Sequence, residues 1–323
     1  MVRSKHQLFT LLGTGALLSL LVSPCKTLGT NLSPELPSTT TTSLPQINFA
    51  QAAVLGMVQG LTEFLPISST GHLKVVSVAL GWGEISIAFA AILELGSIAA
   101  VIWYLWEDLV QIVGGAFKAI QTSDYQSHDL WMVIGIGLGT LPIVCCGLVL
   151  KIFVPDFEHS PLRHLGAIAI ASIVMAILLG VAEYFGKRER NFEELGVRDG
   201  ILMGLAQAMA IIPGVSRSGS TLTAGLLIGL ERATAARFSF LLAIPAITLA
   251  GLVELKGVLD EGLGNANLLP LIVGFVTSLV FSYLAIAWLL RFLQTQNTWV
   301  FVWYRLAFGT AILGALAFGN SSH

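Results

Sequence analysis

The side chains with the most reactive chemistry gather in one short stretch behind an apolar segment. Gln59 and Glu63 are four residues apart, which places them on one face of a helix. Pro66 ends that helix, and a group of hydroxyls and an imidazole follows it: Ser68, Ser69, Thr70 and His72. A carboxylate, hydroxyls and an imidazole within one segment can supply a nucleophile, a base and an orienting group. The local alternative is that a serine caps the next helix and Glu63 is an interfacial charge.

A second polar cluster lies in a turn rich in glycine and serine that follows Pro213. Its members are Ser216, Arg217, Ser218, Gly219, Ser220 and Thr221. Hydroxyls, backbone N–H groups and the start of the next helix favour an anion there, and a guanidinium fork matches phosphate. The sequence holds no G-x-x-x-x-G-K-[ST] pattern, so we do not expect a nucleotide. The structural alternative is an ion pair of Arg217 with Glu63 or another acid.

Two further charges lie inside apolar segments, Glu94 and Arg305. Glu94 either lines a cavity or bonds across helices, and the sequence leaves both open. For Arg305 we expect pairing with an acid or a side chain that reaches the membrane surface. The histidines and cysteines form no metal-ligand pattern. Glu63 alone suits a loosely held Mg²⁺ or Ca²⁺ better than a full metal cage, and we expect no organic cofactor.

The composition restricts the class of protein. The chain has 323 residues, of which 55 % are apolar and 11 % charged. An average soluble domain carries about 25 % charged residues, so a soluble enzyme of this length is nearly excluded. The net charge of −2 and the lack of a basic run argue against a nucleic-acid partner. The remaining class is a polytopic membrane protein.

Apolar runs predict how the chain crosses the membrane. Six have the length of a spanning helix: Ile85–Trp106, Leu130–Val154, Leu162–Phe185, Phe238–Leu255, Leu268–Leu290 and Trp299–Phe318. The connection Glu107–Asp129 is interpreted as a loop. Two other runs, Asn48–Leu65 and Gly200–Ile212, each lead into a proline and a polar cluster. Because broken helices at membrane depth need protein or a water cavity around them, these runs predict two re-entrant helical hairpins.

The two hairpins share a pattern, Gly-x-x-Gln before a Pro and a Ser, which begins at Gly56 and at Gly204. Three spans follow each hairpin, and an odd number inserts the second copy upside down. Paired broken segments in such inverted repeats meet near the midplane and form the site. The predicted fold class is an all-α polytopic membrane protein with an inverted-topology repeat, two re-entrant hairpins and about six transmembrane helices.

The chain divides into three predicted parts. Residues 1–28 resemble a signal peptide or an uncleaved anchor, and residues 29–47 form a linker rich in Ser, Thr and Pro. Residues 48–318 form the membrane domain, with repeat one at about 48–185 and repeat two at about 200–318. Lysine and arginine between 187 and 198 place that loop in the cytoplasm, so the first hairpin begins outside.

Two segments, QGLTEFLPISSTGHL and PGVSRSGST, resemble the signatures of the bacterial undecaprenyl-diphosphate phosphatase family (UppP/BacA). The resemblance covers about residues 48–318. It implies hydrolysis of undecaprenyl diphosphate to undecaprenyl phosphate and inorganic phosphate, which recycles the lipid carrier for peptidoglycan synthesis and gives bacitracin resistance. It also implies a bacterial plasma membrane location and a site that faces the periplasm. Whether the protein forms a homodimer is left open.

The resemblance also assigns roles to residues. Glu63, Ser69, His72 and Arg217 are the expected catalytic residues, and the expected substrate contacts are Gln59, Ser68, Thr70, Ser216, Ser218 and Thr221. The family often has Glu where this chain has Gln59, and usually Gln where it has Glu94, which puts a two-carboxylate metal site in doubt. The rival hypothesis is a transporter for the same lipid phosphate, because inverted repeats with broken helices are typical of transporters.

Overall fold

The computed structural model describes residues 47–83, 85–153, 160–261 and 268–319. The described residues are mainly helical and form no named strand, which confirms the predicted all-α class. The proposed signal or anchor segment and nearly all of the proposed linker lie outside the described residues. Three short 3-10 helices lie within these described ranges: η4 (Pro161–Arg163), η5 (Phe192–Glu194) and η6 (Met209–Ile211).

The predicted spans all appear as helices. Five of them are long and apolar enough to cross a membrane. They are α5 (His128–Phe153), α6 (Leu165–Phe185), α9 (Arg232–Glu261), α10 (Leu268–Thr295) and α11 (Trp299–Gly319). The remaining predicted span is α3 (Ile87–Tyr104), which meets the same criterion when it is joined to the helix that follows. The chain is therefore a multi-pass membrane protein.

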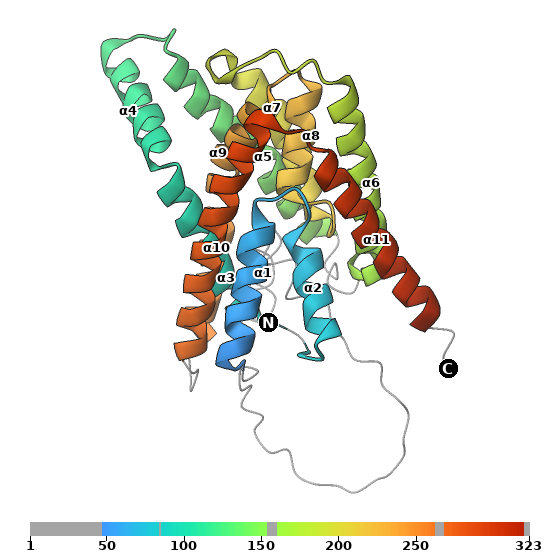
Figure 1. The fold of residues 1–323 in the computed structure, drawn as a ribbon. Helices are drawn as coiled ribbons and strands as arrows, with labels where there is room; N and C mark the ends of the chain where they lie inside the picture. Colours follow the sequence, from blue (N-terminus) through green and yellow to red (C-terminus); the bar gives the residue numbers. More distant parts are fainter. Residues whose placement is uncertain (1–46, 84, 154–159, 262–267, 320–323) are drawn as a thin grey trace, which may run out of the picture.

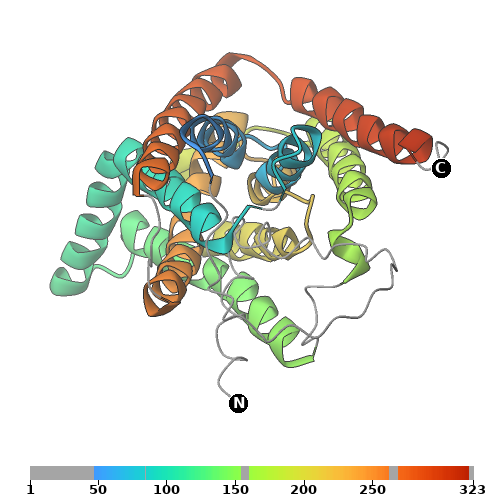
Figure 2. The ribbon, with the colours of Figure 1, turned by 90° about the horizontal axis from the view of Figure 1, so that it is seen from below.

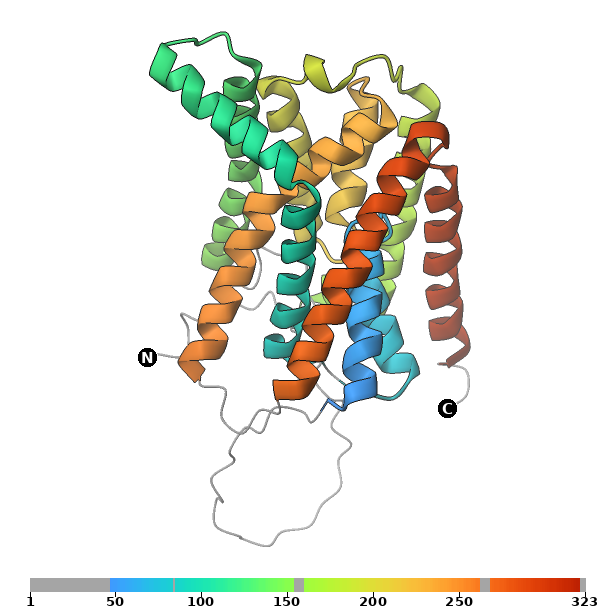
Figure 3. The ribbon, with the colours of Figure 1, turned by 60° about the vertical axis from the view of Figure 1, so that its left-hand side comes forward.

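The connection after α3 corrects the prediction of a loop. It contains a helix, α4 (Trp106–Thr122), which is bent by 69° from α3 and runs along the outside of the bundle (Figure 3). Charged residues lower the apolar content of this segment, but its apolar side chains recur at helical spacing. One face packs Ile112 and Ala116 inward, and an ion pair from Asp108 to Arg237 (2.7 Å) fixes the start of α4 to α9.

Two helical hairpins enter the bundle from opposite ends (Figure 1). The first consists of α1 (Phe49–Glu63) and α2 (Ser69–Ala79), and the second of α7 (Val197–Ala208), η6 and α8 (Arg217–Leu227). Seen from below, the first hairpin lies in the middle of the molecule with the spans around it (Figure 2). The turns of the two hairpins touch, because the Ser218 hydroxyl donates a hydrogen bond to the Leu65 carbonyl at 2.9 Å.

Both turns break in the same way. The residue that precedes each returning helix is a serine in the left-handed region, Ser68 with φ 74° and Ser216 with φ 72°. That region is costly for a residue with a side chain, and such strain persists where the surroundings over-determine it. The returning helices are both 11 residues long. In this register Gly71 matches Gly219, and Gln59 matches Gln207.

Each hairpin packs closely on a span from the other half of the chain: α1 on α10, and α7 on α5. Glycines permit this approach. A methyl group added at Gly56 would lie 2.6 Å from the Gly274 carbonyl oxygen, and one at Gly204 would lie 2.1 Å from the Gly139 carbonyl oxygen. Small residues at such crossings let helix backbones come together without bulky side chains between them.

The end of the bundle from which α7 and α8 enter is held by a buried carboxylate, Glu183 of α6. Arg232 at the start of α9 pairs with it through both Nε and Nη2. Arg188 donates to the same carboxylate at 2.8 Å, and the Thr298 hydroxyl, just before α11, donates at 2.8 Å. This network, the Glu183 clamp, ties three separate segments to the end of α6.

Candidate functional site

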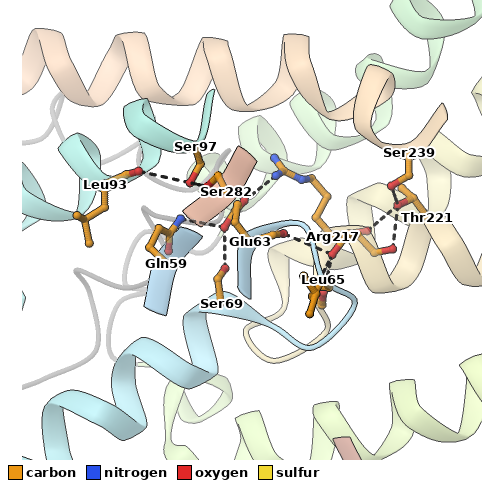
Figure 4. A network of polar contacts seen from close by, with 12 residues as sticks. Gln59, Glu63, Leu65, Ser69, Leu93, Ser97, Arg217, Thr221, Ser239 and Ser282 are labelled. Atoms are coloured by element: carbon orange, nitrogen blue, oxygen red, sulfur yellow. Dashed lines mark hydrogen bonds and ion pairs between the residues drawn. The ribbon is translucent and has the colours of Figure 1, made fainter. Parts of the chain in front are cut away.

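The centre of the site is the carboxylate of Glu63, the last residue of α1 (Figure 4). Its Oε2 accepts hydrogen bonds from the Ser69 hydroxyl at 2.7 Å and from the Gln59 amide at 2.9 Å. Its Oε1 accepts from Arg217 Nη2 at 2.6 Å. The structure therefore brings together residues of both predicted clusters, which are 154 positions apart in the chain.

Arg217 begins α8 and is buried together with its acid partner. The ion pair with Glu63 is the structural alternative that the sequence left open. It uses Nη2 of the guanidinium and leaves Nη1 without a bond to Glu63. Among the described residues, Nη1 is buried and finds no hydrogen-bond partner. An unpaired buried donor is costly, so this nitrogen is positioned to donate a hydrogen bond to an oxyanion.

A small pocket opens between the two turns. It is lined from both hairpins: Glu63, Ser68, Ser69, Thr70, Ala210, Ile212, Pro213, Gly214, Ser216 and Arg217. Six of the ten predicted site residues are in that list. The pocket thus has a carboxylate and hydroxyls on one wall and a guanidinium on the other.

The remaining hydroxyls of the second cluster shape the turn. Ser216 caps α8 by accepting from the Gly219 N–H at 3.2 Å, and its Oγ lies 3.2 Å from that of Ser218. Thr221 donates to the Arg217 carbonyl at 2.9 Å and shares a hydrogen bond with Ser239 of α9. Sequence analysis did not identify Ser239, because nothing in the pattern of α9 distinguishes it from a polar residue packed between helices.

His72 points toward α11 and contacts a tyrosine there. Its Nδ1 donates to the Ser68 carbonyl at 2.8 Å, so in the neutral ring Nε2 accepts from the Tyr304 hydroxyl at 2.6 Å. The ring stacks on Phe308 with centroids 4.1 Å apart. Through its bond to the Ser68 carbonyl, His72 helps to hold the backbone of Ser68 in its positive-φ conformation. Tyr304 is a second residue that the sequence did not single out.

Polar residues also line the contact between α3 and α10 behind Gln59 (Figure 4). Ser97 lies 3.1 Å from the Ser278 hydroxyl and accepts from Ser282 at 2.9 Å, and all three are fully buried. Glu94, three residues before Ser97, is buried on α3. This ladder of hydroxyls joins the two helices on which the first hairpin packs.

Arg305 of α11 corrects an expectation from the sequence. We expected an acid partner or a side chain that reaches the membrane surface, but the residue is 1 % exposed and bonds to backbone carbonyls. Its Nη1 donates to Pro66 at 3.0 Å, and its Nη2 donates to Gly214 at 2.7 Å and to Val215 at 3.1 Å. Its Nε donates to Ser172 of α6 at 3.2 Å. Arg305 therefore joins the two turns to the spans beside them.

The described residues contain no group of three or more His, Cys, Asp or Glu side chains that could hold a metal ion. Glu63 is the carboxylate that faces the pocket, and its oxygens already accept bonds from three side chains. Mg²⁺ is commonly held by one or two carboxylates together with substrate phosphates. The residues present fit that arrangement, with most of the ligands coming from a bound phosphate.

Comparison with known proteins gives consistent matches. The family model described as bacitracin resistance protein BacA matches residues 52–311. A Nostoc protein named undecaprenyl-diphosphatase is 60 % identical over 316 residues, which cover 98 % of this chain and 97 % of that protein. Proteins of the same name from Trichodesmium erythraeum and from a Synechocystis species are 62 % and 63 % identical over 83 % and 84 % of this chain, and over 86 % and 84 % of their own lengths.

Proposed function

This chain belongs to the bacitracin resistance protein BacA family, and we propose that it is an integral membrane phosphatase that hydrolyses undecaprenyl diphosphate to undecaprenyl phosphate and inorganic phosphate. In a bacterial plasma membrane this reaction recycles the lipid carrier for peptidoglycan synthesis and gives resistance to bacitracin. The names of the relatives and the chemistry of the pocket support the same activity.

One observation carries the proposal: Arg217 lines the pocket with one nitrogen paired to Glu63 and the other buried without a partner in the described part of the chain. The free nitrogen and the start of α8 favour a phosphate oxygen. On the opposite wall, the Ser69 hydroxyl already donates to Glu63. A phosphate held by Arg217 would thus lie beside a hydroxyl with an adjacent base.

The arrangement supports a nucleophilic mechanism with Glu63 as the base. The Ser69 oxygen forms a bond to the terminal phosphorus, its proton passes to Glu63, and the bond from phosphorus to the bridging oxygen breaks. Undecaprenyl phosphate leaves with the bridging oxygen. Water then cleaves the phosphoserine: its oxygen bonds to phosphorus, one of its protons restores the Ser69 hydroxyl, and inorganic phosphate leaves. Glu63 gives up the proton it had accepted, to the departing phosphate or to water, and the site is restored. In the alternative, Ser69 orients a water molecule that attacks directly, and Glu63 accepts its proton.

Several finer features belong to the same proposal. We infer an inverted repeat, which the opposite entry of the two hairpins and their matching turns support. The basic loop near Arg188 then lies in the cytoplasm, and the site faces the periplasm. A loosely held Mg²⁺ or Ca²⁺ with Glu63 as its protein ligand would neutralise charge on the diphosphate. The protein acts without an organic cofactor or nucleic acid, and a homodimer is its proposed assembly.

The first test is phosphate release from undecaprenyl diphosphate by detergent-purified protein with Mg²⁺ or Ca²⁺. We expect release by the wild type, loss to background in Arg217→Ala, and about a hundredfold loss of kcat/KM in Arg217→Lys, which keeps the charge but not the fork. Arg198→Ala removes an exposed arginine and is the matched control, which should keep wild-type activity. Wild-type turnover by Arg217→Lys would contradict the assignment.

The same preparation separates the phosphatase from a lipid transporter. A transporter needs charge and dipoles for binding but no nucleophile beside a base. A wild-type protein that binds the lipid yet releases no phosphate with either cation would favour transport, as would a Ser69→Ala variant that still moves lipid between leaflets. Trapping of phosphate on Ser69 would decide between the covalent mechanism and direct attack by water.

A further inference from the structure

The two turns that form the pocket are held from behind by one side chain, Arg305. Its four hydrogen bonds go to carbonyls of the first turn, the second turn and α6. The guanidinium also lies against the first turn of α8, because a methyl group added at Gly219 would come within 3.0 Å of Nη1. The Arg305 side chain therefore contacts both hairpin turns and the start of α8, the helix that begins with Arg217.

Arg305 and Arg217 differ in whether an acidic residue pairs with their charge. Arg217 is paired with Glu63 at 2.6 Å, so the two together add no net charge to the pocket. Every partner of Arg305 among the described residues is a neutral carbonyl. A buried charge without a counter-ion produces a strong field at short range, because little water screens it. Arg305 thus places a positive charge behind the two turns that no described carboxylate pairs.

A structural role alone would not require this residue. The same carbonyls could be satisfied by neutral donors, and an arginine inside the membrane is costly. Its guanidinium carries several donors in a fixed plane, so one side chain can bond carbonyls from three segments at once. It also places a positive charge behind the site where a diphosphate, with several negative charges, has to be held.

We propose that Arg305 is a positioning residue with two roles: it fixes the two hairpin turns relative to each other, and it supplies the net positive charge that binds the diphosphate. The inference rests on the proposed phosphatase activity for its substrate but not for its geometry. The two roles separate experimentally, because lysine keeps the charge and loses the fork, whereas glutamine keeps a donor and loses the charge.

The experiment measures two quantities on the full chain in detergent. The first is the Kd for inorganic diphosphate by titration calorimetry, which reports the charge without turnover. The second is kcat for phosphate release from undecaprenyl diphosphate. We expect Arg305→Gln to weaken diphosphate binding about tenfold or more and to raise KM in parallel. We expect Arg305→Lys to keep Kd within about threefold and to lose about tenfold in kcat, because the turns are less well fixed.

A second variant tests positioning without replacing the arginine. Gly219→Ala pushes on Nη1 at 3.0 Å and on Ser216 Cβ and Oγ at 3.2 Å while the charge of Arg305 stays. Because it shifts the second turn, it should reproduce the Arg305→Lys pattern of lower kcat with a nearly unchanged Kd. Gly114→Ala, at a glycine with open space around it, is the control and should match the wild type. Folding of each variant is checked by its thermal transition and its elution as a single species.

Each result supports or overturns one role. A wild-type Kd in Arg305→Gln would overturn the role of the charge, and a wild-type kcat in both Arg305→Lys and Gly219→Ala would overturn the role in positioning. If Arg305→Gln does not fold, Arg305→Lys tests the charge instead, because it keeps the positive charge, and loss of diphosphate binding in that folded variant would contradict it. Absence of turnover in the wild type would overturn the proposed function, while the Kd values would still report on Arg305.

Discussion

The two hairpins share the form of their turns and returning helices but carry very different side chains. Both turn through a serine with positive φ, and both return as helices of 11 residues. Yet in the common register Glu63 corresponds to Ile211, and Ser69 corresponds to Arg217. The first hairpin supplies an acid and a hydroxyl, and the second supplies a cation at a helix start. The comparison teaches that two hairpins with matching turns can bring unlike groups together, because both turns line one pocket.

The largest effect is expected at the position where the hairpins differ most. Glu63→Gln keeps the shape and removes the base, so kcat/KM for phosphate release should fall by about a thousandfold, or about 4 kcal/mol in the transition state. The matched change at the corresponding position, Ile211→Val, should leave kcat within about threefold and lower stability by about 1 kcal/mol, since it removes one buried methylene group. Equal losses of activity in the two variants would contradict the assignment of the base to the first hairpin alone.

A smaller effect, equal in both hairpins, is expected where they are alike. Gly56→Ala and Gly204→Ala each place a methyl group against a carbonyl of the span on which the hairpin packs. Each should lower the free energy of unfolding by about 1–3 kcal/mol, with a lower thermal transition in detergent. Gly114→Ala on the open side of α4 should keep or raise the transition temperature. If Gly56→Ala lowered the stability and Gly204→Ala did not, the two hairpins would not pack on their spans in the same way.

The smallest effect concerns two glutamines at equivalent positions. Gln59 donates to Glu63 at 2.9 Å, whereas Gln207 is fully buried and its amide finds no partner among the described residues. Gln207→Leu should therefore raise the stability by about 1 kcal/mol and leave turnover unchanged, because a desolvated amide is replaced by an apolar group. Gln59→Leu should lower kcat up to about tenfold. A loss of activity in Gln207→Leu would show that the second amide also serves the site.

The sequence predicted the spans and the two broken segments well, because long apolar runs and prolines are local signals. It also predicted that Glu63, Ser69 and Arg217 belong to one site. The sequence reading missed the amphipathic helix α4, because Glu107, Asp108 and Lys118 lower the apolar content of that segment. The partners of Arg305 could not be predicted, since backbone carbonyls from three distant segments carry no mark in the sequence.

The Glu183 clamp limits how the molecule can move. A motion that opened this end of the bundle would have to separate Arg188, Arg232 and Thr298 from one buried carboxylate. Stranding a charge in this way costs about 3–5 kcal/mol, so the open form would be populated in fewer than about one molecule in a hundred. Carriage of a lipid across the membrane needs both ends to open in turn, whereas cleavage of its headgroup does not. The clamp therefore suits a protein that receives its lipid and gives it back in the same leaflet.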